Sequence, residues 1–344
     1  MERATIADVA AEAGVSVSTV NRILGGKAQV RNSTIQKVQS AAERIGYYGL
    51  GAIAYRLTEA TPTYRLGFLL QQSHRPLYQL LNAKIIQACH QRQTDIVNPL
   101  IDFVDQLTPE NIARRLIALG RECDAVALIA ADHPLVGNAI RELKAMGKPV
   151  VTYITDQSST DRAAYVGTDN WMLGRTAGYL MTRMAHREGS IAVLIGNHRY
   201  QCQDIADASF RSYVREHAPH LIVQESRPTH EVPDQAYRMV RDQLANSSEL
   251  VGILIVGGGI SGVLRALREV PEERRKKILL ICRDTGPETR RGLGEELITA
   301  SLCHPVDATS ELLIDTMIEV IGNGNLDAPL YKTIPFEILT PMNI

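Results

Sequence analysis

Apolar residues recur at helical spacing in three short segments within the first fifty residues. The positions that share an inward face are Ile6, Val9, Ala10 and Ala13 in the first segment, Val20, Ile23 and Leu24 in the second, and Ile35, Val38, Ala42 and Ile45 in the third. Thr5 stands three residues before Asp8, a capping-box spacing that predicts the start of the first helix. Gly14 permits a turn after that helix, and Ser16 can cap the second one. The pattern predicts a small unit built only from helices.

From Tyr64 onward, apolar runs of strand length alternate with helical segments. The runs cover residues 65–70, 124–130, 148–154, 190–196, 250–256, 277–282 and 296–302. Continuous apolar strands separated by helices are typical of parallel sheets that carry helices on both faces. About 280 residues of this pattern exceed one sheet of ordinary size, so we expect two similar lobes.

The composition is that of an ordinary globular protein, with 45% apolar and 22% charged residues in a chain of 344. A net charge of −1 argues against a wholly basic nucleic-acid coat. No apolar run reaches the roughly 18 residues of a membrane span, and the first residues lack the apolar core of a secretion signal. Five scattered cysteines without C-x-x-C spacing suit a reducing compartment, so we expect a cytoplasmic protein.

The second predicted helix has small and hydrogen-bonding residues on its outward face. Val17, Ser18, Asn21 and Arg22 lie opposite its apolar positions. A helix that enters the major groove of DNA needs little bulk, donors that meet base edges, and a guanidinium for guanine or phosphate. Its capped start can also hold a phosphate. A three-helix packing unit with a solvated face is the alternative interpretation of the same pattern.

Charge is distributed unevenly between the two parts of the chain. Residues 1–60 contain seven basic and five acidic residues, a net charge of +2, whereas the remainder has a net charge of −3. This asymmetry points modestly toward DNA as a partner of the first part.

Two stretches of this first part carry a family resemblance. TIADVAAEAGVSVSTVNRILGG and VRNSTIQKVQSAAERIGY closely resemble the DNA-binding headpiece of the LacI/GalR family of bacterial transcription repressors. The rest of the chain resembles the effector-binding core of the same family, which looks like a periplasmic sugar-binding protein. The resemblance implies a small all-α helix-turn-helix headpiece followed by an α/β two-lobed core with parallel sheets.

The implied domain division follows from that resemblance. Residues 1–49 would form the headpiece, 50–62 the hinge or linker, and 63–344 the core for effector binding and dimerisation. Within the core we expect an N-lobe of about 63–168 and 298–326, and a C-lobe of about 169–297 and 327–344.

The resemblance also implies DNA-binding roles for individual residues. Val17 and Ser18 occupy the two variable positions that choose the operator sequence, and Arg22 matches the base-reading arginine. The stretch IAYRL resembles the hinge helix, so Leu57 would enter the minor groove and kink the DNA. The complete expected set is Thr5, Ser16, Val17, Ser18, Thr19, Asn21, Arg22, Arg31 and Leu57.

Three departures from the family pattern accompany these matches. The sequence GLG stands where the family usually has Pro-Asn before the hinge helix. Arg31 replaces a usual serine cap before the third helix, which would trade a cap for a phosphate contact, and Asn21 stands where the family usually has serine.

Three glycines in the second half of the chain have dinucleotide-binding spacing. Gly257, Gly259 and Gly262 form G-x-G-x-x-G between a strand-like run and a helical one, and Asp284 ends the next strand-like run. This arrangement leaves open an NAD-dependent oxidoreductase. In the family that the chain resembles, the same loop faces the effector. Glycines such as Gly258 would let the backbone of this loop approach a ligand closely. A third interpretation is a tight turn and nothing more.

Polar and aromatic residues follow the predicted strands, where a cleft between two lobes would lie. Planar polar side chains pair with sugar hydroxyls, and aromatic faces cover the apolar sides of a sugar ring. The expected effector-binding set is Gln71, Tyr78, Asp132, Asp156, Trp171, Asn197, Gln203, Asp204, Gly258, Asp284 and His304.

The family resemblance distinguishes some members of this set. Asp284 matches the family's sugar-binding acid, and His304 stands where many members have glutamine. Ala206 replaces the effector-binding arginine of the family's R-x-x-G-F helix, so Gln203 or Asp204, one turn earlier, would substitute for it.

Catalytic and metal-binding motifs are not visible in the sequence. The nine histidines show no ligand spacing, and Ser261 lacks the pattern of a nucleophile elbow. We therefore expect no metal, no cofactor and no enzymatic activity. The expected function is that of a homodimeric transcription regulator, a repressor of a pseudo-palindromic operator controlled by a small metabolite, which we expect to be a sugar or sugar derivative. The sequence does not decide between a dimer and a tetramer. It also does not decide whether the effector releases the protein from DNA or promotes DNA binding.

Overall fold

A computed structural model describes residues 4–25, 30–53, 61–324 and 328–344 of the chain, without the side chain of Asn32. The chain forms two compact units. One consists of Met1–Tyr64 with His90–Asn98, and the other of Arg65–Cys89 with Pro99–Ile344.

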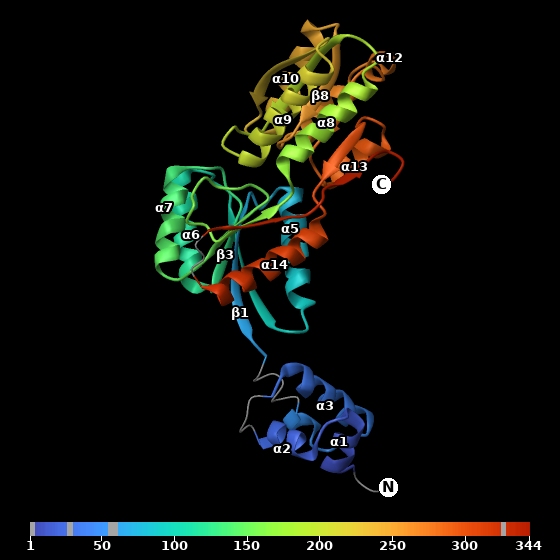
Figure 1. Cartoon of the computed structure of the whole chain (residues 1–344). Helices are drawn as coiled ribbons and strands as arrows, with labels where there is room; N and C mark the ends of the chain where they lie inside the picture. Colours follow the sequence, from blue (N-terminus) through green and yellow to red (C-terminus); the bar gives the residue numbers. More distant parts are fainter. Residues whose placement is uncertain (1–3, 26–29, 54–60, 325–327) are drawn as a thin grey trace. The chain divides into compact units, whose positions relative to one another are not determined.

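The three helices that the sequence predicts are present in the first unit (Figure 1): α1 (Ile6–Ala13), α2 (Val17–Gly25) and α3 (Asn32–Arg44). Their common core is the predicted one, extended by Tyr47 and Ile53. The capping box is present, because the Thr5 amide donates to Asp8 over 2.8 Å while the Asp8 amide donates to the Thr5 hydroxyl over 3.4 Å. Gly14 has a φ of 64°, the left-handed conformation that the turn between α1 and α2 requires. Leu57 lies outside the described residues.

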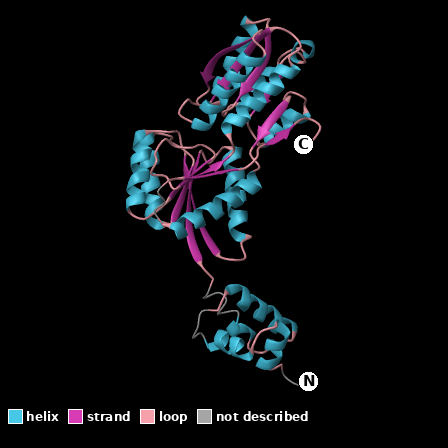
Figure 2. Ribbon diagram, in the orientation of Figure 1, coloured by secondary structure: helices cyan, strands magenta, loops and turns pink. Residues whose placement is uncertain are grey.

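The larger unit contains two six-stranded sheets in its described part. The first follows the order β11-β5-β4-β3-β1-β2. Figure 2 shows the strands in magenta with helices in cyan on both sides. Its strands are β1 (Thr63–Gln71), β2 (Ile96–Val104), β3 (Ala125–Leu128), β4 (Val150–Tyr153), β5 (Ala164–Gly167) and β11 (Leu330–Thr333). Helices α6 (Pro109–Glu122) and α7 (Pro134–Ala145) cover one face, and α5 (Pro76–His90) and α14 (Val306–Asn323) the other (Figure 1). We call this assembly the first lobe.

The second sheet follows the order β12-β10-β9-β8-β6-β7, and β12 alone is antiparallel to its neighbour. Its strands are β6 (Gly189–Ile195), β7 (Leu221–Pro228), β8 (Leu250–Ile255), β9 (Leu279–Cys282), β10 (Ala300–Cys303) and β12 (Glu337–Leu339). Two buried clusters lie on its opposite faces, one with α8 (Asn170–Met184) and α9 (Gln201–His217). The other contains α10 (Pro233–Asn246), α11 (Ile260–Arg268) and α13 (Pro287–Gly294), while the short α12 spans Glu272–Arg275. This is the second lobe.

The structure differs from the expected division between the lobes at two strands. Residues 298–326 were expected in the first lobe and 327–344 in the second, but β10 pairs with β9 in the second sheet and β11 pairs with β5 in the first. The apolar pattern identifies β10 as a strand but carries no information about which sheet it joins. The chain therefore crosses between the lobes after β5, after β10 and after β11.

Each predicted apolar run became a strand, whereas five strands were not anticipated. Four of these, β2, β7, β11 and β12, lie at sheet edges and carry mixed polar residues, including Pro99 within β2. The fifth, β5, is an interior strand of four residues.

No helix within the described residues is long and apolar enough to cross a lipid bilayer.

Candidate functional sites

The outward face of α2 is exposed as predicted. Val17 is 45% exposed, and Ser18, Asn21 and Arg22 are exposed as well, whereas Val20 and Ile23 are buried against the other helices. An apolar side chain held in solvent at the start of a helix contributes nothing to the core, so its exposure is compatible with a contact surface.

Hydroxyl groups order the beginning of this helix. The Ser16 hydroxyl caps α2 by accepting from the Thr19 amide over 3.2 Å, and it lies 2.8 Å from the hydroxyls of both Ser18 and Thr19. The Arg22 guanidinium donates to the Thr19 hydroxyl over 3.2 Å. These contacts place three hydroxyls and one cation together, a donor set suited to phosphates and base edges.

Two further residues of the expected DNA-binding set lie at other helix starts. Thr5 is engaged in the capping box of α1, so its role inside the unit is structural. Arg31 stands at the N-cap of α3 and its side chain makes no capping hydrogen bond, which agrees with the predicted exchange of a cap for an arginine. Arg31 is exposed.

A cleft in the larger unit lies between the ends of strands from both lobes. Its lining residues are Arg75, Leu77, Tyr78, Ile129, Ile154, Thr155, Tyr200, Cys202, Gln203, Glu231, Val256, Gly257, Gly258, Arg283, Asp284, Thr285 and His304. The open space among these side chains is only about 70 Å³. Since the carboxyl ends of β1, β3, β4, β6, β8, β9 and β10 supply most of this lining, the cleft lies where open parallel sheets bind ligands.

Five members of the expected effector-binding set line this cleft: Tyr78, Gln203, Gly258, Asp284 and His304. Gln71 lies directly behind the lining. Its Oε1 accepts hydrogen bonds from the hydroxyls of Tyr78 and Tyr200, both over 2.9 Å, and its Nε2 donates to the carbonyl of Ile129. Gln71 therefore orients two aromatic residues of the cleft.

The structure places the other five expected residues away from the lining. Asp132 binds Ser158 and Gln201 beside a separate open hollow. Asp156 is paired with Arg162, and Trp171 is 48% exposed on α8.

Asn197 and Asp204 complete that group. The Asn197 side chain accepts from the Arg199 amide, and Asp204 faces His198 over 3.5 Å in an exposed pair. The strand-end rule selects an edge of a sheet, but the direction of the following loop decides which of its residues face the cleft.

Several charged and aromatic residues of the lining were not in the expected set. Arg283 directly follows β9 and Thr155 lies two residues beyond β4, so the strand-end rule reaches both. Arg75, Tyr200 and Glu231 stand several residues beyond their strands, and no spacing in the sequence distinguishes them.

An ion pair crosses the cleft between the lobes. Arg75 of the first lobe donates from Nη1 to Oε2 of Glu231 in the second lobe over 2.8 Å, and the Glu231 side chain is only 8% exposed. Gln203 donates from Nε2 to Oε1 of the same carboxylate over 3.0 Å. His230 and Glu231 have φ values of 51° and 62°, a left-handed conformation that non-glycine residues seldom adopt.

A second cation of the cleft is held by neutral partners. Arg283 donates to the Cys202 carbonyl, the Thr168 hydroxyl and Nε2 of His304, the last over 2.9 Å. Burial lowers the pKa of His304 well below its usual value, and the charge of Arg283 lowers this pKa further. His304 is therefore neutral and accepts through Nε2, which leaves its proton on Nδ1.

Asp284 is partly buried at the same edge. Its carboxylate accepts from the Thr289 hydroxyl and from the Gly286 amide, the latter over 3.1 Å. Burial raises the pKa of Asp284, while the Thr289 hydrogen bond opposes that rise. The Thr289 hydroxyl and the Gly286 amide thus hold the carboxylate in place.

The glycine spacing in the second lobe has a packing explanation. A Cβ on Gly257 would collide with the backbone of Gly196, and a Cβ on Gly262 would collide with the Pro233 carbonyl of α10. Gly259 has a φ of 109° just before α11. These requirements account for the G-x-G-x-x-G pattern without a dinucleotide, and nothing observed supports the oxidoreductase alternative.

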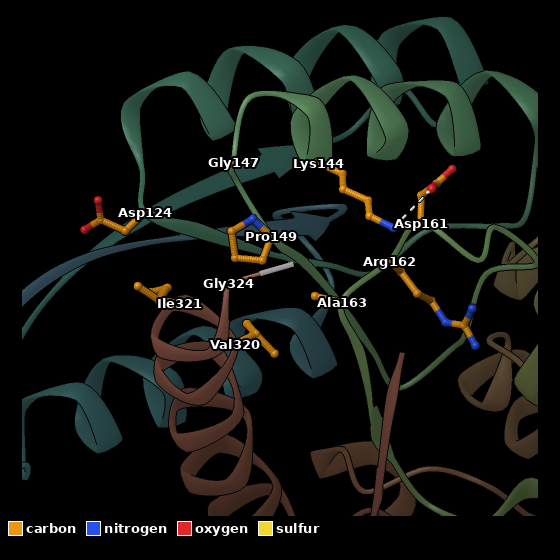
Figure 3. A pocket seen from close by; sticks show the side chains of 10 residues that line it. All are labelled: Asp124, Lys144, Gly147, Pro149, Asp161, Arg162, Ala163, Val320, Ile321 and Gly324. Atoms are coloured by element: carbon orange, nitrogen blue, oxygen red, sulfur yellow. Dashed lines mark hydrogen bonds and ion pairs between the residues drawn. The ribbon is translucent and has the colours of Figure 1, made fainter. Parts of the chain in front are cut away.

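A second cavity of about 250 Å³ lies at the opposite end of the first sheet (Figure 3). Asp124, Pro149 and Ala163, which immediately precede β3, β4 and β5, line it. Lys144 and Asp161 face each other at its rim over 3.4 Å. Because it lies at the amino ends of the strands, this cavity is not the site that the fold favours for a ligand.

Comparison with known families matches both parts of the chain. Residues 66–325 match the family described as "Periplasmic binding protein domain", and residues 5–49 match "Bacterial regulatory proteins, lacI family". The chain belongs to the lacI family of bacterial regulatory proteins. The regulator thus combines a DNA-binding headpiece with a periplasmic-binding-protein-like core, as its sequence predicts.

Relatives of the regulator share its full length. It is 24% identical to the sucrose operon repressor of Lactococcus lactis subsp. lactis, covering 93% of this chain and 94% of the relative. The ribose operon repressor of Haemophilus influenzae is 23% identical, covering 97% and 96%. Among solved structures, the glucose-galactose binding protein GanP from Geobacillus stearothermophilus has a TM-score of 0.73 at 19% identity, covering 83% of this chain and 99% of that protein. The similarity to GanP concerns only the fold of the core.

Proposed function

We propose that this regulator is a repressor whose affinity for operator DNA is controlled by a carbohydrate-derived metabolite in the cleft between its lobes. The observation that supports this most strongly is the combination, on one chain, of the exposed α2 face with a polar cleft at the carboxyl ends of two parallel sheets.

Recognition of DNA is assigned to α2. Val17, Ser18 and Asn21 would contact base edges in the major groove, while Arg22 would read a guanine or hold a phosphate. Ser16, Thr19 and Arg31 would bind phosphates, and Leu57 would enter the minor groove. Thr5 would act by fixing the start of α1.

The partners follow from this assignment. Two headpieces of a homodimer would each read one half-site of a pseudo-palindromic operator. Residues 1–49 would form the headpiece, 50–62 the hinge, and the following chain the core for effector binding and dimerisation. A protein with this partner acts where the chromosome is, which places it in the bacterial cytoplasm, and its action is binding rather than catalysis.

A carbohydrate-derived effector is supported by the cleft and by the relatives. Sucrose and ribose operon repressors are named for sugars. Asp284, Gln203 and His304 offer planar polar groups, and Tyr78 adds an aromatic one.

The contacts between the lobes suggest how the signal would travel. Arg75–Glu231, Gln71–Tyr200 and Asp132–Gln201 each join one lobe to the other. A ligand that enters the cleft must alter these contacts and with them the relative position of the lobes. The coupling is reciprocal, so an effector that weakens DNA binding binds the DNA-bound form less well, typically by about 1–3 kcal/mol.

A titration of labelled promoter DNA from the source genome tests this proposal. The purified protein should bind one fragment at nanomolar concentration and lose or gain affinity about 5–150-fold when one compound from a panel of sugars, polyols and sugar derivatives is present. A protein whose DNA affinity no cleft-binding compound alters would contradict the proposed control.

A further inference from the structure

The carboxylate of Glu231 occupies a prepared anion position in the second lobe. Its two oxygens accept from Arg75 Nη1 over 2.8 Å and from Gln203 Nε2 over 3.0 Å. Gln203 cannot present its oxygen instead, because that oxygen accepts from the amides of Gly196 and Asn197 over 2.6 and 3.2 Å. Two fixed donors therefore converge on one carboxylate.

The backbone around this position leaves room for an anion. A Cβ on Gly196 or on Gly258 would overlap the carboxylate of Glu231, so both glycines make space for it. Gly258 also lies just before α11, whose first amide groups have no acceptor within the helix and favour negative charge. Gly258, which lies inside the G-x-G-x-x-G segment, thus receives a carboxylate from the chain itself.

Glu231 is held there in an unusual conformation. It and His230 have positive φ angles in the loop between β7 and α10. Such strain in consecutive non-glycine residues is typical of segments that change conformation in function. Among the side chains of the cleft, that of Glu231 is therefore the one that we expect to move when a ligand binds.

The cleft is too small for a sugar-sized ligand unless one of its own side chains moves out. The open space of about 70 Å³ is smaller than the roughly 150 Å³ cavity that accepts benzene, and far below an ordinary ligand pocket. A sugar-sized ligand can enter only if the Arg75–Glu231 pair separates. Arg75 then loses its ion-pair partner in a partly buried place and keeps only the charge of Asp284, with which it forms no ion pair. An anionic ligand can restore the lost ion pair, whereas a neutral ligand cannot.

A second arginine adds to this demand for negative charge. Arg283 is only 8% exposed, and within the described residues it forms no ion pair. Its Nε and the Nδ1 of His304 are buried without an acceptor among those residues. Two unfulfilled donors in the wall of one cleft are expected where a ligand rich in acceptor oxygens completes the site.

From this geometry we infer that the effector is an anionic sugar derivative, a sugar acid or a sugar phosphate, whose negative group replaces the Glu231 carboxylate on Arg75 and Gln203. The inference rests on the proposed function, since it specifies the ligand of the same cleft. Asp284 stays in place to accept from hydroxyls, and Glu231 acts as an internal competitor that keeps the empty cleft closed.

Inorganic phosphate is a direct probe of this anion position, measured by thermal unfolding at constant ionic strength. Glu231→Gln retains the shape of the side chain but removes the competing charge, so phosphate should raise the unfolding temperature of this variant more than that of the unchanged protein. The double variant Glu231→Gln, Arg75→Gln keeps the cleft free of an unpaired charge and should lose the response. Arg121→Gln, which alters an exposed arginine of the same lobe, should respond like the unchanged protein.

Equal stabilisation of Glu231→Gln and of the double variant by phosphate would overturn the inference. Calorimetry with D-glucose, D-glucuronate and D-glucose 6-phosphate then compares a neutral ring with its carboxylate and phosphate derivatives, and the tighter of the two anions identifies the chemistry. We expect at least about tenfold preference for one anion over glucose. Binding of glucose as tightly as both anions would leave the proposed regulation by sugars intact and would reject the anionic effector.

Discussion

Tyr200 of the second lobe donates a hydrogen bond to Oε1 of Gln71 in the first lobe, over 2.9 Å. The same oxygen accepts from Tyr78, which belongs to the first lobe, also over 2.9 Å. Two chemically identical hydrogen bonds to one acceptor thus differ only in whether they join the lobes. This arrangement allows stability and lobe coupling to be measured separately.

Replacement of either tyrosine by phenylalanine should lower the free energy of unfolding by about 1 kcal/mol, because each change removes one hydrogen bond while Gln71 keeps the other. Only Tyr200→Phe should loosen the contact between the lobes. Hydrogen exchange followed by mass spectrometry should show faster exchange in peptides around both residue 71 and residue 200 for this variant. For Tyr78→Phe the change should be confined to the first lobe. Identical exchange patterns for the two variants would mean that the Tyr200 contact does not hold the lobes together.

Arg22→Ala should weaken binding to the operator by about 1–3 kcal/mol, because the guanidinium is held by Thr19 on the exposed face of α2. Stability should change by less than about 0.5 kcal/mol, since the side chain is exposed. Arg44→Ala is the matched control, an exposed arginine on α3 that pairs with Glu12 over 2.8 Å. Fluorescence anisotropy should detect the loss for Arg22→Ala alone. A similar loss for both variants would indicate a general charge effect rather than recognition by α2.

Stability of the core should fall at mildly acidic pH because His304 is buried in its neutral form. The pKa of His304 is depressed in the folded protein, so below its unfolded value of 6.5 the unfolded chain binds a proton that the folded chain does not. The stabilising contribution is therefore complete above pH 6.5 and is lost as the pH falls toward the folded pKa. The slope approaches about 1.4 kcal/mol per pH unit for one proton.

His304→Gln removes this titration and keeps an acceptor for Arg283. Urea unfolding between pH 7.5 and 5.5, a range chosen at roughly one unit on either side of the unfolded pKa, should show a steeper loss for the unchanged protein than for the variant. Parallel pH profiles of the two proteins would show that His304 takes up its proton in the folded state.

Gly262→Ala should destabilise the second lobe by about 1–3 kcal/mol, because the new methyl group would meet the Pro233 carbonyl of α10. Gly137→Ala in α7 is the matched change. There the nearest side-chain atom, Cβ of Ser159, would be 3.5 Å away, so the gain in helix propensity of up to about 1 kcal/mol should dominate. Thermal unfolding measures the change in stability of both variants. If Gly262→Ala were neutral, close packing of α11 on α10 would not explain that glycine.

Local patterns in the sequence predicted the elements well where burial is continuous. The run from residue 250 to 256 could only be an interior strand, and β8 is fully buried. The edge strand β7 contains Gln224, Glu225 and Arg227, and so it lacks the signal. Membership of β10 in the second sheet depends on a crossover between lobes, which no local pattern encodes.

The candidate cleft was predictable only in part, for a related reason. Asp284 and His304 lie within two residues of the ends of β9 and β10 and face the cleft. Asp132 and Asp156 lie four and three residues beyond the ends of β3 and β4 and turn toward partners in the loops. Glu231 reaches the cleft from a loop with positive φ angles, a conformation that its sequence does not announce.

Selection of random duplex DNA by the full-length protein tests the central claim most directly. The account predicts that the bound pool converges on one pseudo-palindromic sequence with two half-sites, and that Arg22→Ala weakens the enrichment. A pool that stays random after repeated rounds at low salt, with and without sugar derivatives present, would contradict the assignment of this protein as a sequence-specific regulator.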